Sequence, residues 1–131
     1  MISENIHDPL IESLNEASME IVPILKSLGN EYRFQILLQL LKGTKSFGNI
    51  VKNTNREKTA ISNHLSHLIN TNLIKKGDYG IYRISGDGIE FMKAIDSAFQ
   101  QSPTRQLKKF NELQSRKISK LFLNRFSQYS P

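Results

Sequence analysis

A run of small polar side chains lies along one face of the segment Arg56–Ile74, which reads REKTAISNHLSHLINTNLI. Ile61, Leu65 and Leu68 recur at the spacing of one buried helical face. The opposite face carries hydroxyl and amide groups, which donate and accept hydrogen bonds without adding a strong charge. Asn pairs with adenine, and Ser or Thr with several bases, at the edges of the DNA major groove. This face therefore predicts contact with base edges.

The predicted groove and base contacts are Arg56, Lys58, Thr59, Ser62, Asn63, Ser66 and His67. Those near the helix start are favoured, because recognition helices usually present their N-terminal half to the bases. The alternative for any polar helix face is plain solvation. Basic residues around the segment favour DNA over solvation, since they suit phosphate contact, although lysines on strands also discourage sheet aggregation. They are Lys45, Lys52, Lys75, Lys76 and Arg83.

Other chemistry is weakly supported. His64 and His67 are three residues apart, a spacing found in metal sites, but they diverge by about 60° on the helical wheel and no cysteine or paired carboxylate completes a ligand set. We expect His64 to pack within the domain and His67 to face DNA. Because phosphate loops and nucleophile elbows are also absent from the sequence, we expect no enzyme, no catalytic residue, no metal and no cofactor. A metal-dependent enzyme is the weakest alternative.

Composition is typical of one soluble domain. The 131 residues are 38% hydrophobic and 23% charged, and cysteine is absent. No run of about 18 apolar residues could cross a bilayer. The first ten residues lack the pattern of a secretory signal. These features predict a cytoplasmic protein that is not bound to a membrane and uses no thiol chemistry.

Charge is unevenly distributed. The net charge is +6, but residues 1–31 hold six acids and one lysine, whereas residues 32–93 hold ten bases and four acids. The last thirty-one residues carry seven bases and one acid. A basic centre and a basic tail indicate a polyanionic partner, with a solvated surface as the alternative.

Periodicity and turn signals predict the elements that position these residues. Asp8 is expected to cap a first helix over 9–20, and Pro23 to open a second over 22–28 because proline disrupts a helix interior. Asn30, Ser46 and Ser85 are expected to cap later helices. The further elements expected are a helix to Lys42, a short helix after Ser46, a turn at 53–55, a recognition helix over about 56–70, a hairpin over about 73–84, and helices over 85–100 and from Thr104.

A pair of helices joined by a tight turn and followed by a hairpin is the winged helix-turn-helix arrangement. The predicted fold class is therefore mainly α with a small β-hairpin wing, extended by extra N- and C-terminal helices. We expect residues 1–21 to form a dimerisation helix, 22–101 the DNA-binding domain, and 102–131 a basic amphipathic helix that also dimerises.

Four segments carry a family resemblance. They are LKSLGNEYRFQILLQLLKG (25–43), KSFGNIVKNTN (45–55), KTAISNHLSHLINTNLI (58–74) and GIYRISGDGIEFMKAI (80–95). In order and spacing they resemble the ArsR-type winged-helix transcriptional regulators. The resemblance implies a homodimer that binds a partly palindromic double-stranded DNA operator, with the first and last helices forming the dimer interface.

The two end helices carry more apolar surface than a three-helix core and hairpin can cover, and pairing across a twofold axis would bury it. Packing onto the same chain is the alternative. The expected interface residues are Leu10, Leu14, Ala17, Ile21, Leu107, Phe110, Leu113, Leu121 and Phe122.

The sequence departs from the family pattern at its metal sites. Metal-sensing members carry a Cys-x-Cys pair where Ser46 and Gly48 stand here, and a second family site needs histidines on the last helix, but no histidine follows His67. Soft-metal sensing is therefore not expected, and the effector is unknown. The alternative function is a winged-helix protein-interaction module of a larger assembly without sequence-specific DNA binding.

Overall fold

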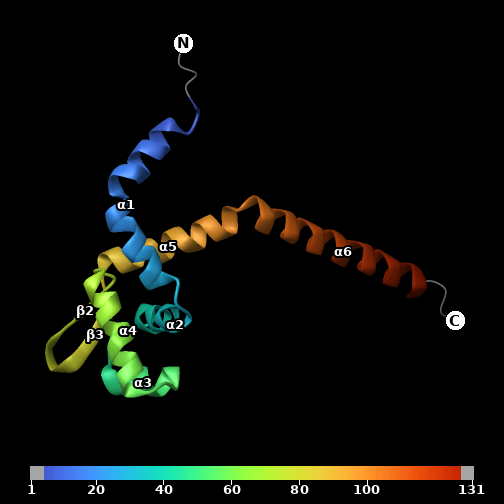
Figure 1. Cartoon of the computed structure of the whole chain (residues 1–131). Helices are drawn as coiled ribbons and strands as arrows, with labels where there is room; N and C mark the ends of the chain where they lie inside the picture. Colours follow the sequence, from blue (N-terminus) through green and yellow to red (C-terminus); the bar gives the residue numbers. More distant parts are fainter. Residues whose placement is uncertain (1–4, 128–131) are drawn as a thin grey trace, which may run out of the picture. The chain divides into compact units, whose positions relative to one another are not determined.

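The computed structural model describes residues 5–127, so residues 1–4 and 128–131 of the expected end segments lie outside it. The elements are α1 (Asp8–Leu28), α2 (Glu31–Leu41), β1 (Lys45–Ser46), α3 (Phe47–Thr54), α4 (Lys58–Asn70), β2 (Ile74–Lys76), the 3₁₀ turn η1 (Asp78–Gly80), β3 (Ile81–Ile84), α5 (Gly86–Gln101) and α6 (Pro103–Ser127) (Figure 1). The chain divides into two compact units, one ending at Glu90 and the other beginning at Phe91. The expected mainly helical class is confirmed. Within the described range, no helix is long and apolar enough to span a membrane.

The core of the first unit lies where α2 meets α3, α4 and the sheet. Ile36 and Leu37 of α2 and Ile61 and Leu68 of α4 are completely buried. Each such side chain contributes about 1.5–3 kcal/mol by leaving water. Asn30 caps the start of α2, as the sequence predicts. Its side chain accepts hydrogen bonds from the backbone amides of Tyr32 and Arg33.

The helix break expected at Pro23 is wrong, because α1 is one continuous helix from Asp8 to Leu28. Proline removes only one backbone hydrogen bond, to the carbonyl of Met19, and the turns on either side keep theirs. The buried Ser27 and Leu28 anchor the last turn in the first unit. The boundary expected at residue 21, between the dimerisation helix and the DNA-binding domain, therefore lies inside α1.

The N-cap expected at Asp8 is also shifted by one residue. Asp8 is the first helical residue, and His7 precedes it without a side-chain capping bond. The Asp8 carboxylate instead accepts a hydrogen bond from the amide of Asn5 at 2.9 Å. A carboxylate in the first turn still stabilises the positive end of the helix dipole.

The sheet has three antiparallel strands in the order β1-β3-β2, not the two of a simple hairpin. Lys45 pairs with Tyr82 and Ser46 with Ile81. The expected strands of the hairpin are confirmed, with Lys75 opposite Arg83. A two-residue strand such as β1 shows no alternation in sequence, because only its distant partner makes it a strand.

The turn expected over 53–55 is mostly helix. The helix α3 continues through Thr54, whose hydroxyl donates to the carbonyl of Ile50 at 2.6 Å, and only Asn55 adopts the left-handed conformation. Asparagine tolerates that conformation and commonly follows the end of a helix. Ser46 caps α3 by accepting from the amide of Asn49, as expected.

The start of α5 is tied to the end of α4. Ser85 accepts from the amide of Gly88 at 2.9 Å, which confirms the expected cap, and its hydroxyl donates to the carbonyl of Asn72. A Cβ at Gly88 would lie 2.2 Å from the carbonyl oxygen of Leu73 and 2.7 Å from a side-chain carbon of Ile84. The close approach of backbone here therefore requires glycine.

Candidate nucleic-acid interface

The helix α4 separates an apolar face from a polar one. Ile61, Leu65 and Leu68 are buried in the first unit. All the predicted groove contacts are exposed: Arg56, Lys58, Thr59, Ser62, Asn63, Ser66 and His67. No other part of the described first unit covers this surface, so its donors and acceptors are available to a partner.

The preceding helix α3 contacts α4, and Asn55 in its left-handed conformation makes the tight turn between them. The helix α4 begins at Lys58, with Glu57 as its N-cap, so Arg56 lies just before the helix rather than in its first turn. The Arg56 guanidinium carbon lies 3.9 Å from the centre of the Tyr32 ring. This stacking orients Arg56 beside the helix start.

His64 links α4 to the end of α1 through Arg33. Nη1 of Arg33 lies 3.2 Å from Nδ1 of His64, while its Nε and Nη2 donate to the carbonyls of Ser27 and Lys26, both at 2.8 Å. The ring of His64 also lies 5.9 Å from that of Tyr32. His64 therefore packs within the domain, as the sequence predicts.

Burial and neighbouring positive charges favour the neutral form of His64. Its pKa is lowered from the ordinary 6.5, first by burial and then by the positive charges of Arg33, His67 and Arg56. Because Arg33 only donates, Nδ1 of His64 must accept, which the neutral ring can do. Burial also lowers the pKa of Arg33 itself.

The predicted phosphate contacts lie on the sheet and on α3. Lys75 and Arg83 are exposed and face each other across β2 and β3. Lys45 and Lys76 both pair with Tyr82, one from each side, and Nζ of Lys76 lies 5.8 Å from its ring. Lys52 on α3 is exposed, whereas Lys45 is only half-exposed.

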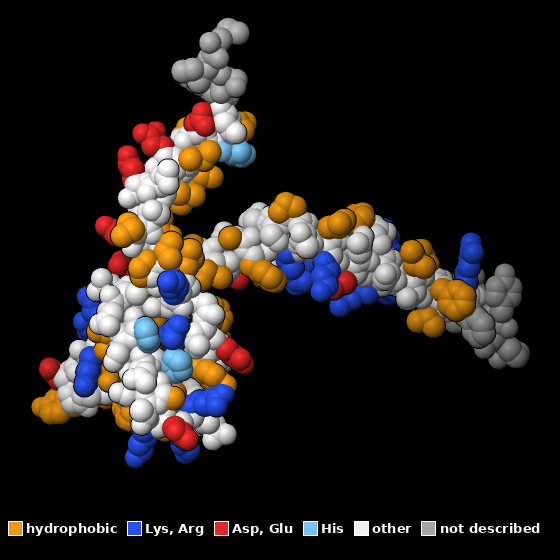
Figure 2. All heavy atoms as spheres, in the orientation of Figure 1, with side chains coloured by type: hydrophobic (Ala, Val, Ile, Leu, Met, Phe, Trp, Pro, Cys, Tyr) orange, Lys and Arg blue, Asp and Glu red, His pale blue; other side chains and the backbone are white. Residues whose placement is uncertain are grey.

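The predicted dimer residues are exposed or half-buried within the unit that contains each of them. In α1, Leu10 and Leu14 are 56% and 49% exposed, and Ala17 and Ile21 are half-buried. In α6, the apolar residues are about 60% exposed: Leu107, Phe110, Leu113, Leu121 and Phe122. Figure 2 shows hydrophobic side chains on the surface of each helix. Within its own unit, neither helix has its apolar residues fully buried.

Residues 30–76 match the family model described as bacterial regulatory protein, arsR family. This segment of the chain, which spans α2 to β2, is similar to the helix-turn-helix of that family. HlyU from Vibrio cholerae is 27% identical over 65% of this chain and 94% of its own, with a TM-score of 0.54. HlyU from Vibrio vulnificus, a transcriptional regulator, is 26% identical over 68% of this chain and 97% of its own, with a TM-score of 0.52. No curated protein matches the chain.

The homodimeric winged helix-turn-helix domain of Mb0332 from Mycobacterium bovis has a similar fold. It is 21% identical over 81% of this chain and 95% of its own, with a TM-score of 0.57. The chain thus has a winged helix-turn-helix fold. The two HlyU structures leave about a third of this chain without a counterpart.

Two residues of the winged-helix fold are not predicted as site residues from the sequence. Arg33 lies in the segment 25–43, one of the four segments that carry the family resemblance. Its position in that segment is the signal in the sequence that could have identified it. Tyr79 lies at the wing tip, fully exposed, with φ 62° and ψ 27°. A bulky residue rarely adopts this left-handed conformation, and no pattern in the sequence indicates it.

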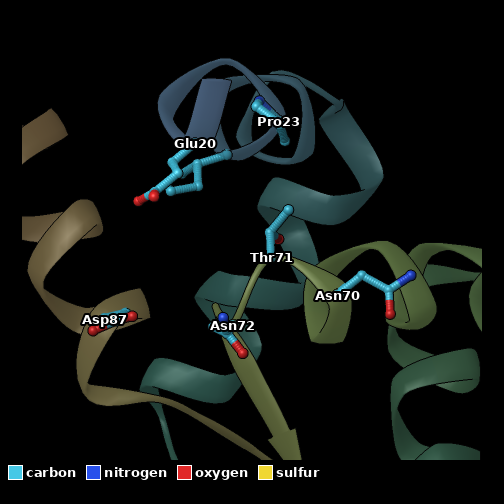
Figure 3. Close-up of a pocket in the computed structure, with 7 residues that line it drawn as sticks. Glu20, Pro23, Asn70, Thr71, Asn72 and Asp87 are labelled. Atoms are coloured by element: carbon cyan, nitrogen blue, oxygen red, sulfur yellow. The ribbon is translucent and has the colours of Figure 1, made fainter. Parts of the chain in front are cut away.

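Two cavities flank the junction of α1 and α4, and both are lined by Pro23, Asn70 and Thr71. One, of about 370 Å³, also has the carboxylates of Glu20 and Asp87 in its lining (Figure 3). The other has about 450 Å³ and a basic lining. The two cavities therefore share residues but differ in the sign of their charge.

Proposed function

We propose that the protein is a transcription regulator that binds specific double-stranded DNA sequences as a homodimer. The exposed polar face of α4 is the observation that carries this proposal. Of the seven side chains that the sequence marks for groove contact, six lie on this face and Arg56 lies just before the helix. All seven are exposed, while the apolar face of the same helix is buried. A helix held in this way enters the major groove with its N-terminal half.

The hairpin supports the same function as a wing beside the groove. The basic surface extends from α4 onto β2 and β3 through Lys75, Lys76 and Arg83. These side chains can contact phosphates of the DNA backbone. If six to eight basic side chains contact phosphates, a plot of the logarithm of the binding constant against the logarithm of the salt concentration should have a slope of about −5 to −7.

The homodimer is proposed from the two end helices. Leu14 of α1 and Phe110 of α6 are exposed in the single chain, and a twofold pairing would bury such residues. Mb0332 is described as homodimeric. In this arrangement residues 1–21 and 102–131 dimerise and residues 22–101 bind DNA.

Gel shifts at low and moderate salt test the proposal, first with a random duplex and then with fragments selected from genomic DNA for binding. Selected fragments should bind at least about a thousandfold more tightly than random duplex. Their shared sequence should be partly palindromic, with half-sites about one helical turn apart. Absence of binding at low salt would instead favour a winged-helix module that assembles with other proteins.

A further inference from the structure

The basic cavity lies between the end of α1, the start of α2 and the last turns of α4. Its volume of about 450 Å³ is within the range of small-molecule sites. Lys26 and Ser27 come from α1, Arg33 from α2, and His67 and Asn70 from α4. A ligand in this cavity would therefore touch both the end helix and the DNA-facing helix.

The described residues that line this cavity include cations and no carboxylate. Within residues 5–127, the contacts of the Arg33 guanidinium are two carbonyls and a histidine ring, none of them a carboxylate. Burial alone lowers the pKa of Arg33, which is the signature of a cation that has lost water without gaining a negative partner. An anion would supply the missing charge.

Arg33 is also held in place before any ligand arrives. Its bonds to the carbonyls of Lys26 and Ser27, both 2.8 Å long, and its contact with His64 use three of its five N–H donors. The remaining donors belong to a fixed, planar group at the cavity wall. Such a group suits phosphate, because a guanidinium can bind two phosphate oxygens at once. Since Arg33 is already held in one conformation, its side chain loses little entropy when the ligand binds.

The neighbouring cavity provides an internal contrast. It shares Asn70 and Thr71 with the basic cavity, but Glu20 and Asp87 give it negative charge (Figure 3). An anion is repelled there by charge, although the size and the shared residues are similar. Selectivity between the two cavities therefore depends on Lys26, Arg33 and His67.

We propose that the basic cavity binds a phosphate-type oxyanion, held by Lys26 and Arg33 with Asn70 as a further hydrogen-bond donor. The oxyanion belongs either to a small phosphorylated molecule or to the backbone of bound DNA. The site itself stands on the cavity and its charges. Only its effect on DNA binding rests on the proposed function.

Titration with inorganic phosphate, at ionic strength held constant with chloride, tests the site in the full-length protein. Backbone amide resonances of Ser27, Arg33 and Asn70 should shift together and saturate. Lys26→Gln should weaken phosphate binding at least about fivefold, whereas Lys42→Gln, an equal charge change at an exposed lysine outside the cavity, should not. Unsaturable shifts, or equal weakening in both variants, would overturn the site.

Salt-dependent DNA binding of the same two variants distinguishes the source of the phosphate. If the DNA backbone occupies the cavity, Lys26→Gln should reduce the magnitude of the salt slope by about one relative to Lys42→Gln. If a small molecule occupies it, the slopes should agree and only the response to phosphate should disappear. Saturable phosphate binding by a protein that binds no DNA would leave the site standing and refute the proposed function.

Discussion

Nδ1 of His64 on α4 lies 3.2 Å from Nη1 of Arg33, and the same guanidinium donates to two carbonyls in the last turn of α1. The orientation of the proposed recognition helix is therefore tied to α1 through a single cation and a neutral imidazole. The contact depends on the protonation state of His64, because a protonated ring has no lone pair left to accept with.

Acidification should destabilise the fold through this contact. The pKa of His64 in the folded protein lies below the ordinary 6.5, so the unfolded chain binds this proton more readily. Stability from His64 is then complete above about pH 6.5 and decreases as pH falls toward the folded-state pKa. Urea unfolding at about pH 7.5 and about pH 5.5 measures the loss. In His64→Gln the pH dependence should be smaller, and an unchanged dependence would contradict the assignment.

Removing the polar groups of α4 should weaken operator binding and leave stability nearly unchanged. Asn63→Ala and Ser66→Ala each remove exposed hydrogen-bonding groups, and a lost base contact costs about 1–3 kcal/mol, so affinity should fall about tenfold. Fluorescence anisotropy with operator and thermal melting give the two readouts. Asn15→Ala on α1 is the matched exposed control. A clearly lower melting temperature in Asn63→Ala and Ser66→Ala than in Asn15→Ala would show that the polar face of α4 has a structural role.

Neutralising one member of the wing pair should weaken DNA binding without harming the fold. Lys75 and Arg83 face each other directly, and like charges in such positions destabilise a sheet by roughly 0.2–1 kcal/mol. Arg83→Gln should therefore keep or slightly raise the melting temperature, while the magnitude of the salt slope of DNA binding falls by about one. A lower melting temperature with unaltered DNA affinity would refute the wing assignment.

Polar substitution in the apolar stripes of the end helices should produce monomers. Leu14→Gln and Phe110→Gln place an amide where the proposed homodimer buries apolar surface, so the dimer dissociation constant should rise at least about tenfold. Sedimentation velocity over a concentration series measures it. Met19→Gln is the control, because Met19 is 87% exposed and lies off the stripe. Loss of the dimer in all three variants would argue against a specific stripe.

Glycine at position 88 should be essential to the packing of α5. Gly88→Ala places a Cβ against the backbone of Leu73, and overpacking of this kind costs about 1–3 kcal/mol. Gly86→Ala is the control, since a Cβ there meets nothing within 4 Å. Chemical unfolding should separate the two variants. Equal unfolding midpoints for Gly88→Ala and Gly86→Ala would mean that the backbone segments at Gly88 and Leu73 can separate at little cost in free energy.

Local signals predicted much of the helix-turn-helix. Caps at Asn30, Ser46 and Ser85 form as expected, because a cap depends on residues only two or three positions away. The buried stripe of α4 was also predictable, since helical spacing alone places Ile61 and Leu65 on one face. The same spacing places the polar residues on the opposite face, and their exposure is a property of the folded structure.

Features that depend on distant partners were missed or misread. Strand β1 exists only because β3 pairs with it. The helix α1 continues through Pro23, where the local signal predicts a break. The left-handed Tyr79 and the placement of Arg33 against His64 likewise depend on the chain around them.

The sequence by itself determined the order of elements, the two faces of α4 and the basic character of the segments around it, because periodicity and capping act over a few residues. Tertiary structure decided which charges meet. Arg33 and His64 are 31 residues apart, and Lys26 and His67 come from different helices that line one cavity. Electrostatic contacts are set by distance in space, and only packing of the core brings those helices together.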